Sequence, residues 1–138
     1  MIKKIEHLGI AVQDIDQSNL LFEQLLGSAP YKSETVEREG VITSFFQLGE
    51  SKIELLQATR SDSPIARFLE KNKEGIHHIA FEVDDIHAEM RRLKELGFVL
   101  LSEEPKLGAD GKIIVFLHPK STNGVLIELC QDTESGVY

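Results

Sequence analysis

Several features are scarce in this sequence, and each scarcity narrows what the protein can be. The 138 residues include a single cysteine, Cys130, so an intramolecular disulfide is impossible, and this residue is expected to be a small apolar side chain at a strand end. No apolar run approaches the roughly 20 residues that a membrane-spanning helix needs. The first residues also lack the apolar segment and cleavage site of a secretory signal. These features predict a cytoplasmic protein, or one of an organelle matrix if a transit peptide has been removed.

Positive charge is scarce as well. The chain has 15 lysines and arginines against 23 aspartates and glutamates, which gives a formal net charge of −8. Nucleic acids and anionic membranes are bound through basic patches, so neither is an expected partner. An anionic substrate would need local cations or a metal ion to overcome the general repulsion. The length and the apolar fraction of 41% are typical of one soluble domain with its own core.

One pattern occurs twice along the chain. Four residue types recur in the same order: His7, Asp14, Gly27 and Glu54 in the first copy, and His78, Asp85, Gly97 and Glu128 in the second. The histidine and the glutamate are 47 residues apart in the first copy and 50 in the second. The chain is therefore interpreted as a duplication of a unit of about 55 residues.

Local patterns predict the order β-α-β-β-β in each copy. Period-two alternation predicts strands at 5–12 and 77–83, and the aspartates Asp14 and Asp85 are expected helix N-caps. Helical stripes should face the core, formed by Leu20, Leu21, Phe22 and Leu25 in the first copy and by Ile86, Met90, Leu93 and Leu96 in the second. Three further strands are expected after each helix, near 31–38, 41–48 and 51–57, and near 98–103, 112–117 and 124–130.

The chain is predicted to be one domain over residues 1–138. Its first module covers about 4–58, a polar connector covers 59–75, and the second module covers about 76–131. The segment Ser61-Asp-Ser-Pro64 marks the start of a short connector helix. Residues 132–138 show no periodicity and are expected to be frayed.

The repeated histidine and glutamate suggest a metal site. His7 shares its strand face with the small residues Gly9 and Ala11, as the wall of a cavity requires. Glu54 and Glu128 interrupt apolar runs, where a carboxylate is costly unless it meets solvent, a cation or a metal. A lone strand glutamate is ordinarily solvated and a lone strand histidine is ordinarily structural. The matched repetition nevertheless favours a site at His7, His78 and Glu128, whose donors suit Zn, Mn, Co, Ni or Fe(II) rather than Ca.

The three remaining histidines have weaker patterns. His77 has the opposite strand parity to His7, so its side chain should face away from the ligands and could support the site or a substrate. His87 falls on a helix surface and is expected to be inert. His118 is either a turn residue or a substrate contact.

Five segments carry a family resemblance that covers nearly the whole chain. They begin Glu6-His-Leu-Gly, Asp62-Ser-Pro-Ile, Gly75-Ile-His-His, Glu104-Pro-Lys-Leu and Phe116-Leu-His-Pro. With them the chain resembles the vicinal oxygen chelate superfamily, which includes glyoxalases, bleomycin resistance proteins and dioxygenases, and within it the methylmalonyl-CoA epimerase family. The resemblance implies an α+β fold in which two tandem βαβββ modules form a cupped, mostly antiparallel sheet around a metal site.

The resemblance also implies an activity. The expected enzyme is a metal-dependent isomerase that interconverts (2R)- and (2S)-methylmalonyl-CoA by abstracting the C2 proton through a metal-stabilised enolate. One divalent ion (Co, Mn, Zn or Ni) is the expected cofactor, held by His7, His78 and Glu128, with Glu54 as a weaker fourth ligand. The expected partners are an acyl-CoA substrate and a second copy of the chain in a homodimer.

Roles for individual residues follow from the same resemblance. Glu128 is the leading candidate for proton transfer, and Glu54, His77 or a metal-bound water is the candidate for the second carrier, because Thr43 stands where some relatives have a carboxylate. Residues expected to contact the substrate are His77, His118, Lys106 and Lys120, with Lys112 also near the cavity mouth. The alternatives are a glyoxalase-like isomerase acting on a glutathione adduct, an Fe(II) ring-cleaving dioxygenase, and a ligand-sequestering protein without catalysis.

Overall fold

The structure is a computed structural model that describes residues 1–133, and the chain forms two compact units. Unit 1 contains Met1–Glu6 and the chain from His78 onward, and unit 2 contains His7–His77. Strand β1 (Ile2–Ala11) passes from unit 1 into unit 2 after Glu6, and strand β5 (Gly75–Val83) returns to unit 1 after His77. Each unit therefore contains part of both strands.

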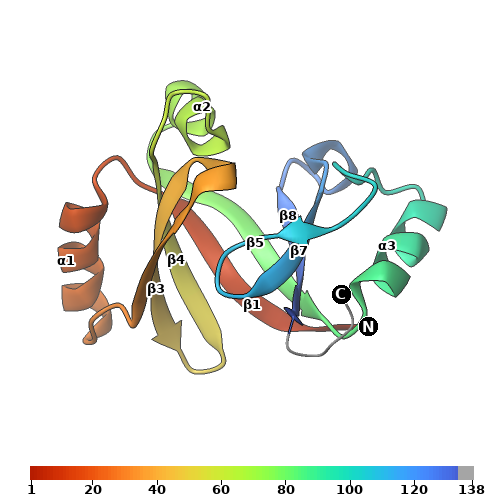
Figure 1. The fold of residues 1–138 in the computed structure, drawn as a ribbon, viewed down its shortest axis with the longest axis horizontal. Coiled ribbons are helices and arrows are strands. Elements are labelled where there is room, and N and C mark those ends of the chain that lie inside the picture. Colours follow the sequence, from red (N-terminus) through yellow and green to blue (C-terminus); the bar gives the residue numbers. More distant parts are fainter. Residues whose placement is uncertain (134–138) are drawn as a thin grey trace. The chain divides into compact units, whose positions relative to one another are not determined.

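Unit 2 contains most of the first module. After β1 come α1 (Ile15–Leu26), β2 (Lys32–Val36), the 3-10 turn η1 (Glu37–Glu39), β3 (Val41–Leu48), β4 (Ser51–Ala58) and α2 (Pro64–Lys71). The strands lie in the order β2-β3-β4-β1, with β3 antiparallel to both of its neighbours and β4 parallel to β1. Figure 1 shows α1 alongside β3 and β4.

The sheet of unit 2 has an apolar cluster on each face. Under α1, the buried residues Val12, Ile15, Phe46 and Leu55 pack with Phe22 and Leu26 of the helix. On the other face, Ile65 of α2 packs on Ala11, Val41 and Leu56. Both faces are therefore partly covered, and the second face also carries side chains of the candidate site.

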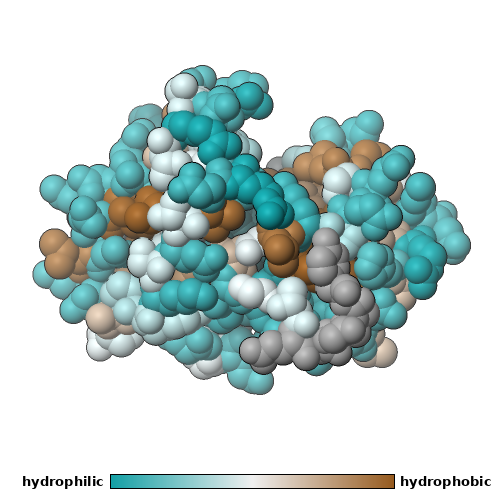
Figure 2. Space-filling model, in the orientation of Figure 1, coloured by the Kyte–Doolittle hydropathy of each residue, from teal (hydrophilic) through white to brown (hydrophobic). Residues whose placement is uncertain are grey.

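The predicted core stripe of α1 was wrong. Leu20, Leu21 and Leu25 are 66%, 57% and 70% exposed, whereas Ile15 is buried and Phe22 and Leu26 are half-buried. Apolar residues lie on two adjacent stripes of this helix, and the stripe through Ile15, Phe22 and Leu26 faces the sheet. Figure 2 shows hydrophobic surface where α1 lies in Figure 1.

Unit 1 contains most of the second module. After β5 come α3 (Ile86–Glu95), β6 (Lys106–Leu107), β7 (Lys112–Leu117), the 3-10 turn η2 (Pro119–Ser121) and β8 (Ile127–Asp132). The first half of β1 lies beside β5, and the order continues β5-β8-β7-β6. In unit 1, β5, which carries His78, is parallel to β8, which carries Glu128, as β1 and β4 are in unit 2. The pairs β6–β7 and β7–β8 are antiparallel. The predicted β-α-β-β-β order is confirmed in both modules.

The core of unit 1 lies between α3 and its sheet. Ile86, Met90 and Leu93 of the helix pack on Val83, Val115 and other buried strand residues. Two predictions in this unit were wrong. Leu96 is the C-cap of α3 and is 66% exposed, and residues 98–103 form no strand. That segment meets β7 through one isolated bridge, Leu100–Leu117, before a run of polar residues.

The predicted helix starts are confirmed. Asp14 and Asp85 each accept a hydrogen bond of 3.1 Å from a first-turn amide, as does Ser63 at the start of α2.

No helix within residues 1–133 has the length and apolarity needed to span a membrane. Asp132, predicted to be frayed, is the last residue of β8, while residues 134–138 lie outside the described residues.

Candidate metal centre

The first candidate ligand pair lies in unit 2. His7 is on β1 and Glu54 is on β4, and the parallel register of the two strands sets Gly9 beside Glu54. His7 and Gly9 share a face of β1, so the imidazole lies on the same face of the sheet as the Glu54 carboxylate. His7 Nε2 lies 3.2 Å from Glu54 Oε1, and the two residues are 6% and 4% exposed.

The second pair, in unit 1, repeats this arrangement. His78 is on β5 and Glu128 is on β8, and the parallel register sets the small residue Ala80 beside Glu128. His78 Nε2 lies 3.2 Å from Glu128 Oε1, and both residues are 4% exposed. The duplication seen in the sequence therefore recurs at the level of side-chain geometry.

An aromatic residue stands beside each carboxylate. Phe45 pairs with Glu54 across β3 and β4, and Phe116 pairs with Glu128 across β7 and β8. The Phe116 ring also meets the His78 ring edge-on, with 5.7 Å between centroids. Both glutamates are only 4% exposed, and a cation interacts more strongly with a carboxylate in such surroundings than in water.

The donors in each pair fit a divalent transition metal. Metal–nitrogen and metal–oxygen bonds of about 2.1 Å, at angles between about 90° and 110°, hold the two donor atoms roughly 3.0–3.4 Å apart. The observed 3.2 Å lies inside that range. Imidazole nitrogen with carboxylate oxygen is also the donor set that Zn, Mn, Co and Ni accept.

The single cysteine adds no donor. Cys130 lies on β8, is fully buried, and donates from its thiol to the Phe81 carbonyl. Burial raises the pKa of the Cys130 thiol far above its ordinary value, so this group stays protonated. Cys130 is a buried small residue as predicted, but it lies inside β8 and not at a strand end.

The other predicted site residues make different contacts. The His77 ring packs edge-on against Phe68 of α2 at 5.0 Å, so it lies against the connector helix. His118 caps η2, because its Nδ1 accepts from the Lys120 amide at 3.0 Å. This is the turn role considered for His118 from the sequence.

The predicted lysines are spread over unit 1. Lys106 is half-buried on β6, Lys120 is exposed in η2, and Lys112 on β7 reaches Asp132 at 3.9 Å. Their contact with a substrate stays a prediction. Thr43 is 1% exposed and its hydroxyl donates to the Glu34 carbonyl, so its proton is held by the protein.

Two glutamines were missed at the sequence level. Gln57 Oε1 accepts from the Ile15 amide at 2.7 Å in unit 2, and Gln131 Oε1 accepts from the Ile86 amide at 2.7 Å in unit 1. Each glutamine follows a candidate ligand glutamate by three residues. The repeated Glu-x-x-Gln was the signal that could have found them.

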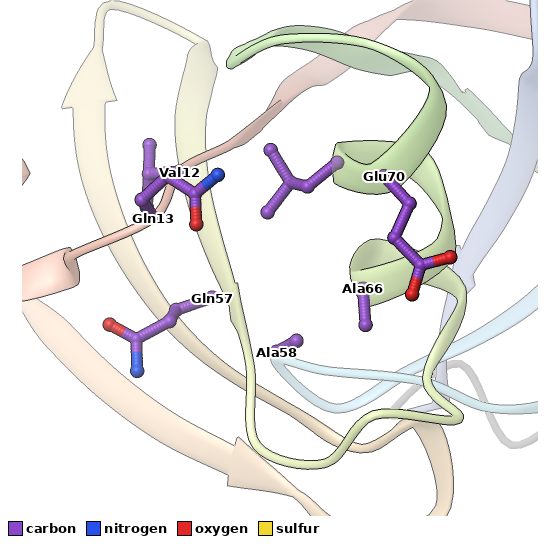
Figure 3. A pocket seen from close by; sticks show the side chains of 7 residues that line it. Val12, Gln13, Gln57, Ala58, Ala66 and Glu70 are labelled. Carbon is purple, nitrogen blue, oxygen red and sulfur yellow. The ribbon is translucent and has the colours of Figure 1, made fainter.

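Unit 2 also contains a groove of about 260 Å³ beside α2 (Figure 3). Gln13 and Gln57 lie on one side of it, and Ala66 and Glu70 of α2 lie on the other. Its polar lining consists of two amides and one carboxylate, which does not favour the phosphates of a CoA chain.

Comparison with known proteins agrees with the fold. Residues 6–116 match the model of the Glyoxalase/Bleomycin resistance protein/Dioxygenase superfamily, and the chain belongs to this superfamily. Within it, the chain is 47% identical to the ethylmalonyl-CoA/methylmalonyl-CoA epimerase of Cereibacter sphaeroides, over 95% of this chain and 99% of the relative. It is 44% identical to the mitochondrial methylmalonyl-CoA epimerase of Homo sapiens, over 93% of this chain and 73% of the relative.

A solved structure gives the same result. A variant of Streptomyces coelicolor methylmalonyl-CoA epimerase in complex with 2-nitronate-propionyl-CoA superimposes with a TM-score of 0.92, at 36% identity and over 96% of each chain. The α+β vicinal oxygen chelate fold predicted from the sequence is thereby confirmed, and so is the resemblance to methylmalonyl-CoA epimerases.

Proposed function

We propose that this protein is a metal-dependent epimerase that interconverts (2R)- and (2S)-methylmalonyl-CoA. The observation that carries the proposal is the buried histidine–glutamate pair that each unit repeats at 3.2 Å. Relatives 44% and 47% identical to this chain are named as epimerases of this substrate. A metalloenzyme needs buried metal-binding side chains of this kind, whereas a protein that only sequesters an apolar molecule does not.

We propose that both pairs bind one divalent cation, with His7, His78 and Glu128 as ligands and Glu54 as a weaker fourth. The donors of each pair are buried and fit such an ion by their chemistry and by the 3.2 Å between them. When bound, the ion supplies Lewis-acid stabilisation of the negative charge that develops when C2 of the substrate loses its proton. It also offsets part of the repulsion between an anionic acyl-CoA and a chain with a net charge of −8.

The protein's own groups transfer the proton. A carboxylate oxygen of Glu128 takes the C2 proton from one face of the substrate and leaves an enolate, and a second group returns a proton to the opposite face. Glu54 is the proposed second group, because it is the equivalent carboxylate of the other module and is held by the same type of pair. Thr43 is excluded from this role by its hydroxyl, which is not basic at neutral pH and already donates to Glu34.

The test is an exchange assay on a single epimer. The purified protein, with its metal content measured by elemental analysis, is given (2S)-methylmalonyl-CoA in deuterium oxide, and inversion and deuterium uptake at C2 are followed. We expect both, with loss of both after chelation and recovery when Co, Mn, Zn or Ni is restored. Activity that persists without metal, or no inversion by the metal-loaded protein, contradicts the proposal.

Two controls sharpen this test. The variant His78→Ala should lose metal and activity together, whereas His87→Ala, in α3 and outside both pairs, should keep both. A glutathione hemithioacetal serves as the second substrate. Turnover of that compound in place of the acyl-CoA would identify the chain as a glyoxalase-like isomerase.

A further inference from the structure

The two missed glutamines occupy equivalent places in the two units. Gln57 is on β4 and Gln131 is on β8, and each accepts the first amide of the helix that follows the histidine strand, Ile15 or Ile86, at 2.7 Å. Gln131 is 2% exposed, so this contact is buried within unit 1. A hydrogen bond of equal length at both places points to a function shared by the modules.

Each glutamine ties the two ligand-bearing strands together. In unit 2, β1 carries His7 and leads into α1, while β4 carries Glu54 three residues before Gln57. Residues three apart on a strand point to opposite faces, so Glu54 points toward His7 while Gln57 points toward the helix start. The parallel register ends at Ala11 and Leu56, and the glutamine bond lies just beyond that end. It therefore adds a side-chain bond to the backbone pairing, between the strand that carries the carboxylate and the helix start that follows the imidazole strand.

We propose that Gln57 and Gln131 are positioning residues that hold each carboxylate in line with the histidine of its pair. The inference rests on the proposed metal function for its affinity readout. Loss of the acceptor lets the end of the glutamate strand move relative to the helix start, so the donor atoms of the pair are less well placed. Groups that orient metal ligands typically change metal affinity by about 10–100-fold when they are removed.

The chain offers a matched control at both places. Asp14 and Asp85 accept from other first-turn amides of the same two helices, Gln17 and Ala88, but they are not on the glutamate strands. Removal of either aspartate costs the helix an acceptor without releasing Glu54 or Glu128. The test compares Gln57→Leu and Gln131→Leu with Asp14→Ala and Asp85→Ala, with Gln57→Glu as the variant that restores an acceptor oxygen at the same length.

Two readouts are taken on the full chain. The dissociation constant for Co²⁺ or Zn²⁺ is measured by competition with a chelator, and the imidazole ¹H–¹⁵N signals of His7 and His78 are recorded without metal. We expect about 10-fold weaker metal binding and a shifted ring signal of the same unit in the leucine variants. The alanine variants and Gln57→Glu should match the wild type in both. Equal effects in leucine and alanine variants would show a merely structural role and overturn the proposal.

The two proposals fail in different ways. A wild-type chain that binds no divalent metal contradicts the proposed function, while the imidazole signals still decide the positioning role. If Gln131→Leu does not fold, the half-buried Gln57 gives the same comparison in unit 2. An unchanged His7 signal in Gln57→Leu then overturns the inference.

Discussion

At the scale of single residues, the site depends on glutamates placed in the middle of apolar strands. The exposed fraction of Glu54 and of Glu128 is 4%, and each carboxylate faces a histidine of its own unit. A carboxylate buried in this way needs a counter-charge, a shared proton or a metal. The two glutamates share this environment, so substitution of each one tests whether they divide the work of proton transfer.

In variant protein that still holds its metal, we expect Glu128→Gln and Glu54→Gln each to lose inversion while retaining proton exchange with one epimer. An amide cannot take a proton from C2, but the remaining carboxylate still serves the face that it reaches. Inversion should fall by about 10²–10⁴-fold in each variant. The measurement is deuterium uptake at C2 of each epimer separately, in protein whose metal content has been determined.

The control for this prediction is the metal itself. If a glutamine variant retains its metal, loss of inversion is attributed to proton transfer, and if it loses the metal, the residue acts as a ligand. Equal exchange of both epimers in both variants would contradict the division of labour between Glu54 and Glu128.

At the scale of helices and strands, the sequence predicted best where the signal is local. The helix caps Asp14 and Asp85 could be predicted because a cap depends only on neighbouring residues. The same holds for strands that end near glycines. The segment 98–103 was predicted to be a strand from its apolar residues, but strand formation depends on a partner along its length, and only Leu100 finds one. The glutamine contacts were missed because they join residues 42 and 45 positions apart.

Helix α1 shows why periodicity alone could not choose a core face. Its apolar residues occupy two adjacent stripes, and only contact with the sheet selects the one with Phe22, which packs on Phe46 with ring centroids 6.2 Å apart. We expect Leu21→Gln to change the free energy of unfolding by no more than about 0.5 kcal/mol. Phe22→Ala should cost roughly 2–4 kcal/mol, because it opens a cavity under the helix. Urea denaturation measures both.

Equal costs for Leu21→Gln and Phe22→Ala would contradict this orientation of α1. A cost for Leu21→Gln that depends on protein concentration would instead show that the exposed stripe is buried in an assembly. That result would support the predicted homodimer.

Helix α3 is anchored by a buried carboxylate, Glu89, which is 4% exposed. The Met1 ammonium donates to Glu89 at 2.8 Å and Arg92 donates to it at 2.9 Å, and these bonds lower the pKa of Glu89 below its ordinary value. A lowered carboxylate pKa adds stability above the unfolded-state pKa of about 4.3, and that stability is lost as the pH falls through the folded-state pKa.

We therefore expect the free energy of unfolding of Glu89→Gln to fall less on acidification than that of the wild type. At pH 7 the variant should be less stable than the wild type, and the difference should shrink below about pH 4. Thermal unfolding at a series of pH values measures this difference. The control is Glu95→Gln, an exposed residue of the same helix, which should follow the wild type throughout. A Glu89→Gln difference that does not change with pH would show that the charge is not its cause.

At the scale of the whole molecule, the duplication was readable but the division into units was not. The matched residues His7 and His78 identified the two modules from sequence. The compact units, however, change over inside β1 and β5, after Glu6 and after His77. No local pattern marks these points, because a strand that serves two units has the same alternation as a strand that serves one.

The shared strands lead to a prediction about unfolding. Met1–Glu6 of unit 1 and His7–Ala11 of unit 2 are consecutive parts of one continuous strand, β1. We expect one cooperative transition, with equal calorimetric and van't Hoff enthalpies. Unit-specific amide probes should melt together.

The unfolding experiment is most informative when it is repeated with metal, because the proposed ligands come from both units. At a free metal concentration 100 times the dissociation constant, a ligand of the folded state alone adds about 2.7 kcal/mol, or roughly 10 °C for a chain of this size. If both pairs bind one ion, the probes of unit 1 and unit 2 should shift together by this amount. His78→Ala, which removes a donor from unit 1 only, should then abolish the shift in unit 2 as well. A shift that survives in unit 2 would mean that the His7–Glu54 pair binds metal independently of the second pair.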